Sequence, residues 1–290
     1  MVRLVTFGAW LGAAVLAASY LGAIHPIGDS FAVFRPQIAV GTLLLAVLVV
    51  RRTWAAAVPG TLALVALLLL SLPRLNPQTP GPITVYQKNM LWRNADVAAL
   101  EADIREAAPD VLFLQELTDP NYVMVERLRD ILPNEFYCWP GQAEPDDARV
   151  GGSVIVTRFE IVENSLVCTS NTVGGRVRTP SGEVSVASVH LRWPWPYGQA
   201  AHVERMLAGL AGLERPVILA GDLNSAPWSD AAARIGAAIG AEPILPAIPS
   251  FPLLPLVTVP IDHVFASSGT LERRPLAGAD HHGILARVTP

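Results

Sequence analysis

Cysteine is scarce in this 290-residue sequence and lysine is nearly absent. The two cysteines, Cys138 and Cys168, form no Cys-x-x-Cys pair, which argues against a zinc ribbon or a thioredoxin-like redox site. They are either two buried thiols or, outside the cytoplasm, a disulfide. Lys88 is the single lysine, and a protein so poor in lysine is not expected to bind nucleic acid through its phosphates.

Charge of either sign is also sparse, at 16% of the chain, whereas hydrophobic residues make up 51%. This composition is more apolar than that of an average soluble domain. Residues 1–80 contain five basic residues and one acidic residue, and residues 81–290 contain 16 basic and 24 acidic residues. The second part is therefore acidic, and it is long enough to bury one sizeable core.

The apolar excess lies in three segments near the N-terminus, Leu4–Ile24, Pro36–Val50 and Trp54–Leu72. A bilayer-spanning helix needs about 20 apolar residues, so the first and third segments are long enough and the second is marginal. A cleaved signal peptide and core helices of a soluble domain are the alternatives. A single arginine before the first segment and the lack of a polar face argue against them. Residues 1–74 are therefore predicted to be a membrane anchor of about three transmembrane helices.

Basic residues flank these segments and favour one orientation. Arg3 and the Arg51–Arg52 turn lie on one side of a three-helix anchor, and Arg35 and Arg74 lie on the other. By the positive-inside tendency, the chain is predicted to be a multi-pass inner-membrane protein. Its N-terminus is cytoplasmic, and the residues after Arg74 are extracytoplasmic. Residues 75–82 contain three prolines and are expected to form a semi-rigid linker.

Residues 83–290 alternate between strand-like and helix-like patterns. Several strand-to-strand steps in the middle favour an α/β sandwich of two sheets covered by helices over a doubly wound sheet. The principal predicted strands are Ile83–Gln87, Val111–Leu114, Val150–Thr157, Ile161–Cys168, Val184–Val189, Val217–Ala220, Ile261–Phe265 and Ile284–Val288, and the predicted helices include Tyr122–Leu132, Gln199–Leu213 and Ala231–Gly240.

The phrase Gly-Asp-Leu-Asn at residues 221–224 follows the apolar run 216–220. Such a run predicts a buried strand. Asp222 and Asn224 then lie at the edge of a sheet, where a substrate can reach them. Asp222 could orient or deprotonate an attacking water, and Asn224 could hold a phosphate by a hydrogen bond. An Asx-turn without catalytic function is the alternative.

Other polar residues also end strand-like runs. Glu116 ends the run Val111–Leu114 and Asn89 ends the first predicted strand. A divalent cation that acts on phosphate prefers hard oxygen ligands and open positions for water and substrate. Glu116 and Asn89 are therefore candidate ligands, although a surface glutamate and a turn asparagine would have the same sequence context.

Histidines complete the set, because His190 and His281 also lie at strand ends. Histidine can orient phosphate oxygens or transfer protons near neutral pH. An aspartate beside a histidine fixes its tautomer, and Asp262 is the candidate partner. His263 and His282 are interpreted as structural.

Taken in order, these phrases resemble the endonuclease/exonuclease/phosphatase superfamily over residues 82–290. The resemblance implies a metal-dependent four-layer α/β sandwich, with Mg²⁺ (or Mn²⁺) held by Asn89, Glu116 and Asp280, and with His281, Asp222, Asp262, His190 and Asn224 as the catalytic residues. Departures are Ala279, Gly283 and Pro260, where the family commonly has serine, proline and arginine. With its apolar N-terminus, the chain is similar to a bacterial membrane-anchored subgroup related to glycopeptide-resistance proteins.

The substrate predicted from these features is a phosphate ester or pyrophosphate of a membrane lipid, hydrolysed on the extracytoplasmic face. The acidic charge argues against nucleic acid. Trp193 and Trp195 follow His190 in an aromatic stretch suited to a membrane interface, so they are candidate substrate-binding residues. An extracytoplasmic nuclease and a non-catalytic membrane interaction protein are the alternatives. The sequence leaves the leaving group and the oligomeric state open.

Overall fold

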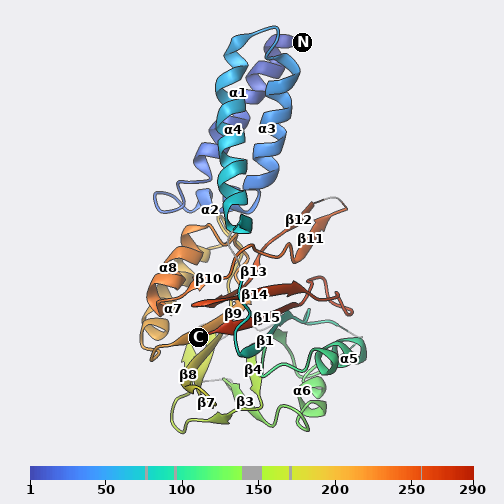
Figure 1. Cartoon of the computed structure of the whole chain (residues 1–290), viewed down its shortest axis with the longest axis vertical. Coiled ribbons are helices and arrows are strands. Elements are labelled where there is room, and N and C mark those ends of the chain that lie inside the picture. Colours follow the sequence, from blue (N-terminus) through green and yellow to red (C-terminus); the bar gives the residue numbers. More distant parts are fainter. Residues whose placement is uncertain (76–77, 95–96, 139–151, 170–171, 256) are drawn as a thin grey trace.

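The computed structural model describes residues 1–75, 78–94, 97–138, 152–169, 172–255 and 257–290. Three long helices stand together at one end, and the other elements form a layered sandwich below them (Figure 1). The N-terminal helices are α1 (Val2–Ala18), α2 (Ile27–Val33), α3 (Arg35–Val49), η1 (Trp54–Ala56), α4 (Ala57–Ser71) and η2 (Leu72–Leu75).

Membrane crossing is supported for fewer helices than the sequence predicted. In the part of the chain that the structure describes, Trp54–Ser71 is the one helical run long and apolar enough by itself to cross a bilayer. Helices α2 and α3 pass the same test only as a pair, and they are bent by 73°. Helix α1 is apolar but has 17 residues. By length and composition, one helix, or two if the bent pair is counted as one span, could cross a membrane, and the predicted three-helix, multi-pass anchor is not supported.

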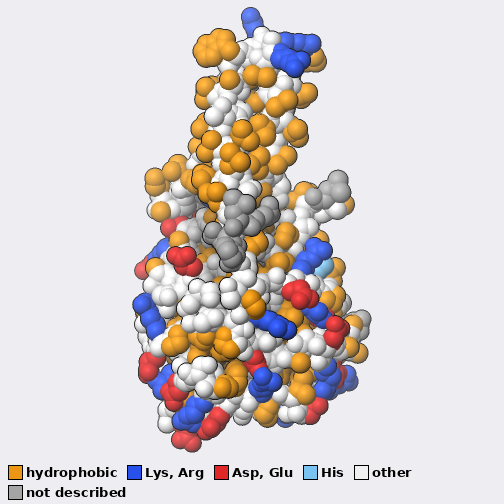
Figure 2. Space-filling view, in the orientation of Figure 1, with side chains coloured by type: hydrophobic (Ala, Val, Ile, Leu, Met, Phe, Trp, Pro, Cys, Tyr) orange, Lys and Arg blue, Asp and Glu red, His pale blue; other side chains and the backbone are white. Residues whose placement is uncertain are grey.

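The N-terminal helices pack through small residues and turn their large apolar residues outward. One contact cluster contains Ala9, Ala46 and Ala56, and a second contains Ala39, Ala63, Ala66 and Leu16. Small side chains allow close helix approach in an apolar solvent. The exposed large apolar residues include Phe7, Leu44, Val47, Leu62 and Leu68. Figure 2 shows hydrophobic side chains over much of the surface of the helical end of the molecule. This inversion of the usual soluble pattern is typical of a surface that faces lipid.

The first sheet has six strands in the order β14-β15-β1-β2-β4-β3. Strands β1 and β2 are parallel, and the other neighbouring pairs are antiparallel. The strands are β1 (Ile83–Asn89), β2 (Val111–Leu117), β3 (Asn134–Tyr137), β4 (Gly152–Thr157), β14 (Ser268–Arg273) and β15 (Ile284–Thr289).

The second sheet has seven strands, with the path β10-β13-β9-β8-β7-β5 and β6 paired to β7. Strands β8 and β9 are its parallel pair. The strands are β5 (Glu160–Ile161), β6 (Val167–Thr169), β7 (Thr172–Thr179), β8 (Gly182–His190), β9 (Val217–Asp222), β10 (Glu242–Pro243) and β13 (Asp262–Ala266), and a separate hairpin consists of β11 (Phe251–Leu254) and β12 (Val257–Val259).

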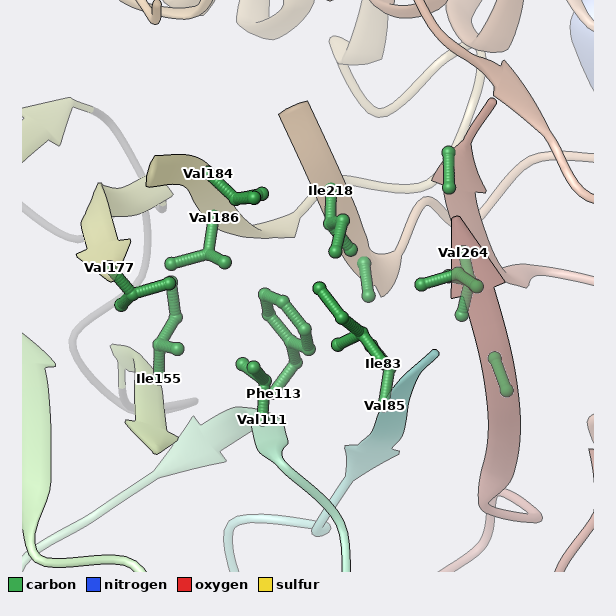
Figure 3. Close-up of a cluster of buried hydrophobic side chains, with 14 of the residues drawn as sticks. Ile83, Val85, Val111, Phe113, Ile155, Val177, Val184, Val186, Ile218 and Val264 are labelled. Carbon is green, nitrogen blue, oxygen red and sulfur yellow. The ribbon is translucent and has the colours of Figure 1, made fainter. Parts of the chain in front are cut away.

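The two sheets pack face to face around a shared apolar core that includes Val85, Phe113, Val186, Ile218 and Val264 (Figure 3). Each outer face is covered by two helices. Helices α5 (Val97–Ala107) and α6 (Val123–Arg127) cover the first sheet, and α7 (Gln199–Ala211) and α8 (Asp230–Ile239) cover the second. The predicted sandwich of two helix-flanked sheets is therefore confirmed.

Some local predictions were wrong. The predicted helix Tyr122–Leu132 is helical only at Val123–Arg127 and continues as turns. The predicted strand Ile161–Cys168 is two short strands, because a turn interrupts it at residues 163–164. These segments are short, so neighbouring elements decide their conformation more than their own sequence does.

The two cysteines form a disulfide. Cys138 and Cys168 are bonded, with their Cα atoms 5.8 Å apart across a separation of 30 residues. The bond joins the end of β3 to β6, and so links the two sheets at their edges. Of the two alternatives that the sequence left open, the structure selects the disulfide.

Candidate active site

The candidate site is the polar end of the core between the sheets. Alternate residues of a strand share a face. On β1, Ile83 and Val85 belong to the inter-sheet core, so Gln87 and Asn89 continue the same inward face. The same change from apolar to polar occurs at Gln115 on β2, Ser188 and His190 on β8, Asp222 on β9 and Asp262 on β13.

Strand register brings these residues together. In the second sheet, Asp222 lies opposite both His190 and Asp262. In the first sheet, Asn89 lies opposite Gln115, next to Glu116. The parallel strands β1 and β2 end at one edge of the first sheet, and the parallel strands β8 and β9 end at one edge of the second. These two edges lie at the same end of the sandwich. Residues separated by up to 192 positions thus meet at one end of the sandwich.

One group of contacts crosses between the sheets. Asn89 Nδ2 donates to Glu116 Oε1 at 3.0 Å and to Asp222 Oδ2 at 2.9 Å. His190 Nε2 lies 4.0 Å from Glu116 Oε1 and 3.7 Å from Asp222 Oδ2. The Asn89 amide donates to both carboxylates, and the His190 ring lies close to both, so these two side chains reduce the repulsion between Glu116 and Asp222.

A second group shares Asp222 with the first. His281 Nδ1 is 2.7 Å from Asp262 Oδ2, and His281 Nε2 is 3.7 Å from Asp222 Oδ2. Ligand atoms of these three residues all lie within 4.8 Å of one another, and all three side chains are buried. When His281 Nδ1 carries the hydrogen that it donates to Asp262, Nε2 faces Asp222 and is the ring atom available for proton transfer.

Burial and neighbouring charges separate the acid–base properties of these groups. Burial raises the pKa of Asp222 to about 7, against the opposing effect of His281. Burial disfavours the imidazolium of His281, but the carboxylates of Asp262 and Asp222 raise its pKa to about 10. For Asp262, burial is likewise outweighed by His281, which lowers its pKa. Burial lowers the pKa of His190. Such divergent values are typical of catalytic sites.

Buried polar residues hold the acidic groups in place. Gln87 Nε2 donates to Gln115 Oε1 and to Asp262 Oδ1, both at 2.9 Å. Gln115 Nε2 donates to Ser188 Oγ at 3.0 Å, which ties the two sheets together. Ser250 Oγ accepts from the backbone N–H of Asp262. Sequence reasoning did not assign Gln87, Ser188 or Ser250, although their strand-end position on the inward face was a usable signal for the first two.

Two site residues have backbone conformations that are unusual for residues other than glycine. Glu116 has φ of 60° and Asn224 has φ of 48°. Left-handed conformations of this kind cluster at functional sites, because the surrounding structure must compensate for their strain. At Glu116, the side chain is fixed further by the backbone N–H of Trp92, which donates to Oε2.

The other predicted site residues are near this centre with varied roles. Asn224 is buried, its Nδ2 donates to Leu191 O, and its backbone N–H donates to Asp222 Oδ1. Its predicted contact with phosphate stays a prediction. Asp280 is exposed beside His281, and its role as a cation ligand also stays a prediction.

The two predicted tryptophans separate. Trp193 is half-buried and packs edge-on against Phe251, with ring centroids 6.0 Å apart. Phe251 itself lies on the ring of His281, at 4.7 Å. Trp195 is exposed and faces His25 of the N-terminal region, 6.2 Å away. Of the two tryptophans, Trp193 therefore belongs to a chain of contacts that leads through Phe251 to the site.

The donor set suits a hard divalent cation. Asp222 and Asp262 offer carboxylate oxygens, the ligands that Mg²⁺ and Mn²⁺ prefer, in one cluster with His281. Glu116 offers another carboxylate on the far side of Asn89 Nδ2 from Asp222. Asn89 turns its amide nitrogen toward two of them, while its Oδ1 accepts from Leu91 N at 3.0 Å. A cation held here would polarise a phosphate oxygen. Beside such a cation, Asp222 would orient a water and accept its proton, and the imidazoles of His281 and His190 would donate to phosphate oxygens.

Comparison with known proteins identifies the family and the fold. The family model described as "Endonuclease/Exonuclease/phosphatase family" matches residues 87–284. No curated protein sequence matches the chain closely enough to be counted as a relative.

Among solved structures, a beta toxin mutant from Staphylococcus aureus with bound magnesium ions is 13% identical, with a TM-score of 0.54 over 73% of this chain and 100% of that one. A family protein from Leptotrichia buccalis is 15% identical, with a TM-score of 0.53 over 72% and 100%. The endonuclease domain of the retrotransposon TRAS1 is 14% identical, with a TM-score of 0.52 over 72% and 99%. At these identities the likeness establishes the fold alone.

Proposed function

Because the chain belongs to the endonuclease/exonuclease/phosphatase family, we propose that it is a membrane-anchored, Mg²⁺- or Mn²⁺-dependent hydrolase of a lipid phosphate ester or pyrophosphate. The observation that carries the lipid assignment is the position of the site next to the apolar helices. Ile261, which precedes Asp262, packs against Val33 of α2. A substrate whose phosphate lies at a bilayer surface would meet the carboxylates without leaving the membrane.

The apolar outer faces of α1, α3 and α4 support anchoring by this helical bundle. Arg3, Arg51 and Arg52 are exposed at the end of the bundle farthest from the sandwich. The positive-inside tendency would make that end cytoplasmic and the sandwich extracytoplasmic. The Cys138–Cys168 disulfide is consistent with this orientation, because such bonds persist in oxidising compartments.

Electrostatics argue against a general nuclease. Residues 81–290 carry 24 acidic and 16 basic residues, and binding to nucleic acid depends on basic groups that displace counterions from phosphates. The single lysine, Lys88, is fully buried, so it cannot reach a nucleic-acid backbone. The TRAS1 endonuclease domain shares the fold, which keeps an extracytoplasmic nuclease as the competing function to be tested.

Two measurements on the full-length protein in detergent test the proposal: phosphate release from lipid phosphates and cleavage of DNA. The purified protein is incubated with Mg²⁺ and either a polyprenyl phosphate, a polyprenyl pyrophosphate or plasmid DNA. Glu116→Gln removes one carboxylate charge at the centre and is expected to lower kcat at least a hundredfold. Glu126→Gln makes the same change at an exposed position of α6 and is expected to have no effect.

Hydrolysis of a lipid phosphate that depends on Glu116 supports the proposal. Cleavage of DNA with inert lipid phosphates would replace it with the nuclease. A C-terminal reporter that is active only in the cytoplasm tests the orientation separately, because a strong signal from that reporter would reverse the assignment of sides.

A further inference from the structure

One surface beside the catalytic centre is built by the N-terminal helices and the sandwich together. Val33, the last residue of α2, is 1% exposed and packs with Val259 and Ile261, just before Asp262. Phe34, at the bend between α2 and α3, packs against the same cluster and is half-buried. The bend thus contacts the polypeptide segment that carries a catalytic aspartate.

Three aromatic rings extend this contact toward the reacting groups. Phe34, Trp193 and Phe251 all pack against the Val33–Val259–Ile261 cluster. Trp193 meets Phe251 edge-on, and Phe251 lies 4.7 Å from the ring of His281. We call Phe34, Trp193 and Phe251 the aromatic wall. It runs from the base of the membrane helices to the imidazole, and each of its rings is partly exposed.

Polar contacts hold Phe34, on the helical side of the wall, in place relative to Trp193 and Phe251, on the sandwich side. Asp29 of α2 accepts from the backbone N–H of Asp230 at 2.8 Å and of Ala231 at 3.0 Å. These N–H groups belong to the first turn of α8, where backbone donors have no partner within the helix and a nearby carboxylate is stabilising. Trp228 Nε1 donates to Ala32 O at 2.8 Å.

A further bond secures the loop that carries Trp193. Ser30 Oγ donates to the backbone oxygen of Trp195 at 2.7 Å. Helix α2 is therefore bonded both to the start of α8 and to the loop after His190. A flexible tether between helices and sandwich would not keep Phe34 and Trp193 in register, whereas these bonds do.

We propose that the aromatic wall binds the hydrocarbon chain of the lipid phosphate, and that Phe34 makes the membrane helices part of the substrate-binding site. The proposal rests on the proposed function. Its occupant is chosen by continuity: the wall begins at Phe34, immediately before the apolar helix α3, and reaches His281 at its other end. A chain leaving the bilayer along this path stays in contact with apolar groups until its phosphate reaches the carboxylates.

The test compares two substrates that share a headgroup, a long-chain polyprenyl phosphate and a short-chain alkyl phosphate, with the full-length protein in detergent. Phe34→Ala is expected to lower kcat/KM about tenfold for the long-chain substrate, through KM, and to leave the short-chain value unchanged. Phe7→Ala is the matched control, because Phe7 lies on the outward face of α1 and is 65% exposed. It should change neither value.

Unchanged short-chain activity shows that Phe34→Ala is folded and that its catalytic centre is intact. If Phe34→Ala does not fold, Trp193→Ala, on the sandwich side of the wall, is expected to lower kcat/KM more for the long-chain substrate than for the short-chain one. Equal loss for both substrates, or no loss for either, would overturn the proposal while leaving lipid phosphate hydrolysis by the wild type in place. Failure of the wild type on every lipid phosphate would instead overturn the proposed function.

Discussion

The contact between Asp262 and His281 gives the sharpest prediction for the substitution Asp262→Asn. Two hydrogen bonds orient the Asp262 carboxylate: its Oδ1 accepts from Gln87 Nε2 at 2.9 Å, and its Oδ2 lies 2.7 Å from His281 Nδ1. Asparagine fits the same space with one orientation that satisfies both. Its oxygen accepts from Gln87, and its amide nitrogen donates to His281 Nδ1.

This orientation fixes a neutral tautomer of the imidazole. With Nδ1 acting as an acceptor, the hydrogen lies on Nε2, and the variant loses the positive charge that His281 carries beside Asp222 at neutral pH. Loss of a buried charge pair is worth about 3–5 kcal/mol. Since about 1.4 kcal/mol is tenfold in rate, kcat should fall by about 10² to 10⁴. Stability at neutral pH should fall as well, because the imidazolium of His281 loses its largest stabilising charge.

Steady-state hydrolysis of a soluble phosphate ester measures kcat, and thermal unfolding measures stability. Asp103→Asn is the control, because Asp103 is also buried and accepts from both Tyr86 Oη and Arg274, away from the site. It should lower Tm and leave kcat within about twofold. An Asp262→Asn variant with wild-type kcat, or one that loses activity only because it unfolds, would refute the tautomer argument.

The same pair predicts the pH dependence of stability in chelator-treated protein. The folded-state pKa of His281, about 10, lies above its unfolded value of 6.5. The folded state therefore binds more protons between these values. His281 contributes stability that is fully present below pH 6.5 and is lost as the pH rises through about 10. Asp262→Asn removes the largest stabilising partner of the imidazolium, so the variant should show a flatter decline over this range.

Four further outcomes are expected. A chelator should abolish hydrolysis, and added Mg²⁺ should restore it. Lys88→Met should lower kcat about tenfold, because Lys88 Nζ donates to the backbone oxygens of His281, Leu276 and Pro275 and so positions the catalytic loop; an unchanged kcat would contradict this. Asp29→Ala should let proteases separate the helices from the sandwich, and the wild type should resist. Cys138→Ser should lower the unfolding free energy by about 3–4 kcal/mol, and an unchanged Tm would contradict the disulfide.

Part of the site could be predicted because strand geometry is local. A strand buried on both faces must carry an apolar run, and its polar end must emerge at the sheet edge. Glu116, His190 and Asp222 each follow such a run, so their position at an edge followed from the sequence. That they converge depended on the order of strands in two sheets, which the family resemblance implied and the register of β8, β9 and β13 established.

Residues whose role depends on distant contacts could not be predicted. Gln87 and Ser188 look like ordinary strand residues, and only the stacking of two sheets links them through Gln115. Phe251 lies in a proline-rich segment with no strand periodicity, and its contact with His281 exists only because the β11–β12 hairpin folds over the site.

The sequence by itself determined the strand ends that carry the chemistry, the apolar character of the first 74 residues and the acidity of the rest, because each depends on residue type and spacing along the chain. The tertiary structure decided that α2 bends away from α3, that Asp29 bonds to the start of α8, and that Cys138 pairs with Cys168. These features join segments up to 201 residues apart. No local pattern encodes such a pairing, since each partner has many sterically possible alternatives until the whole core has packed.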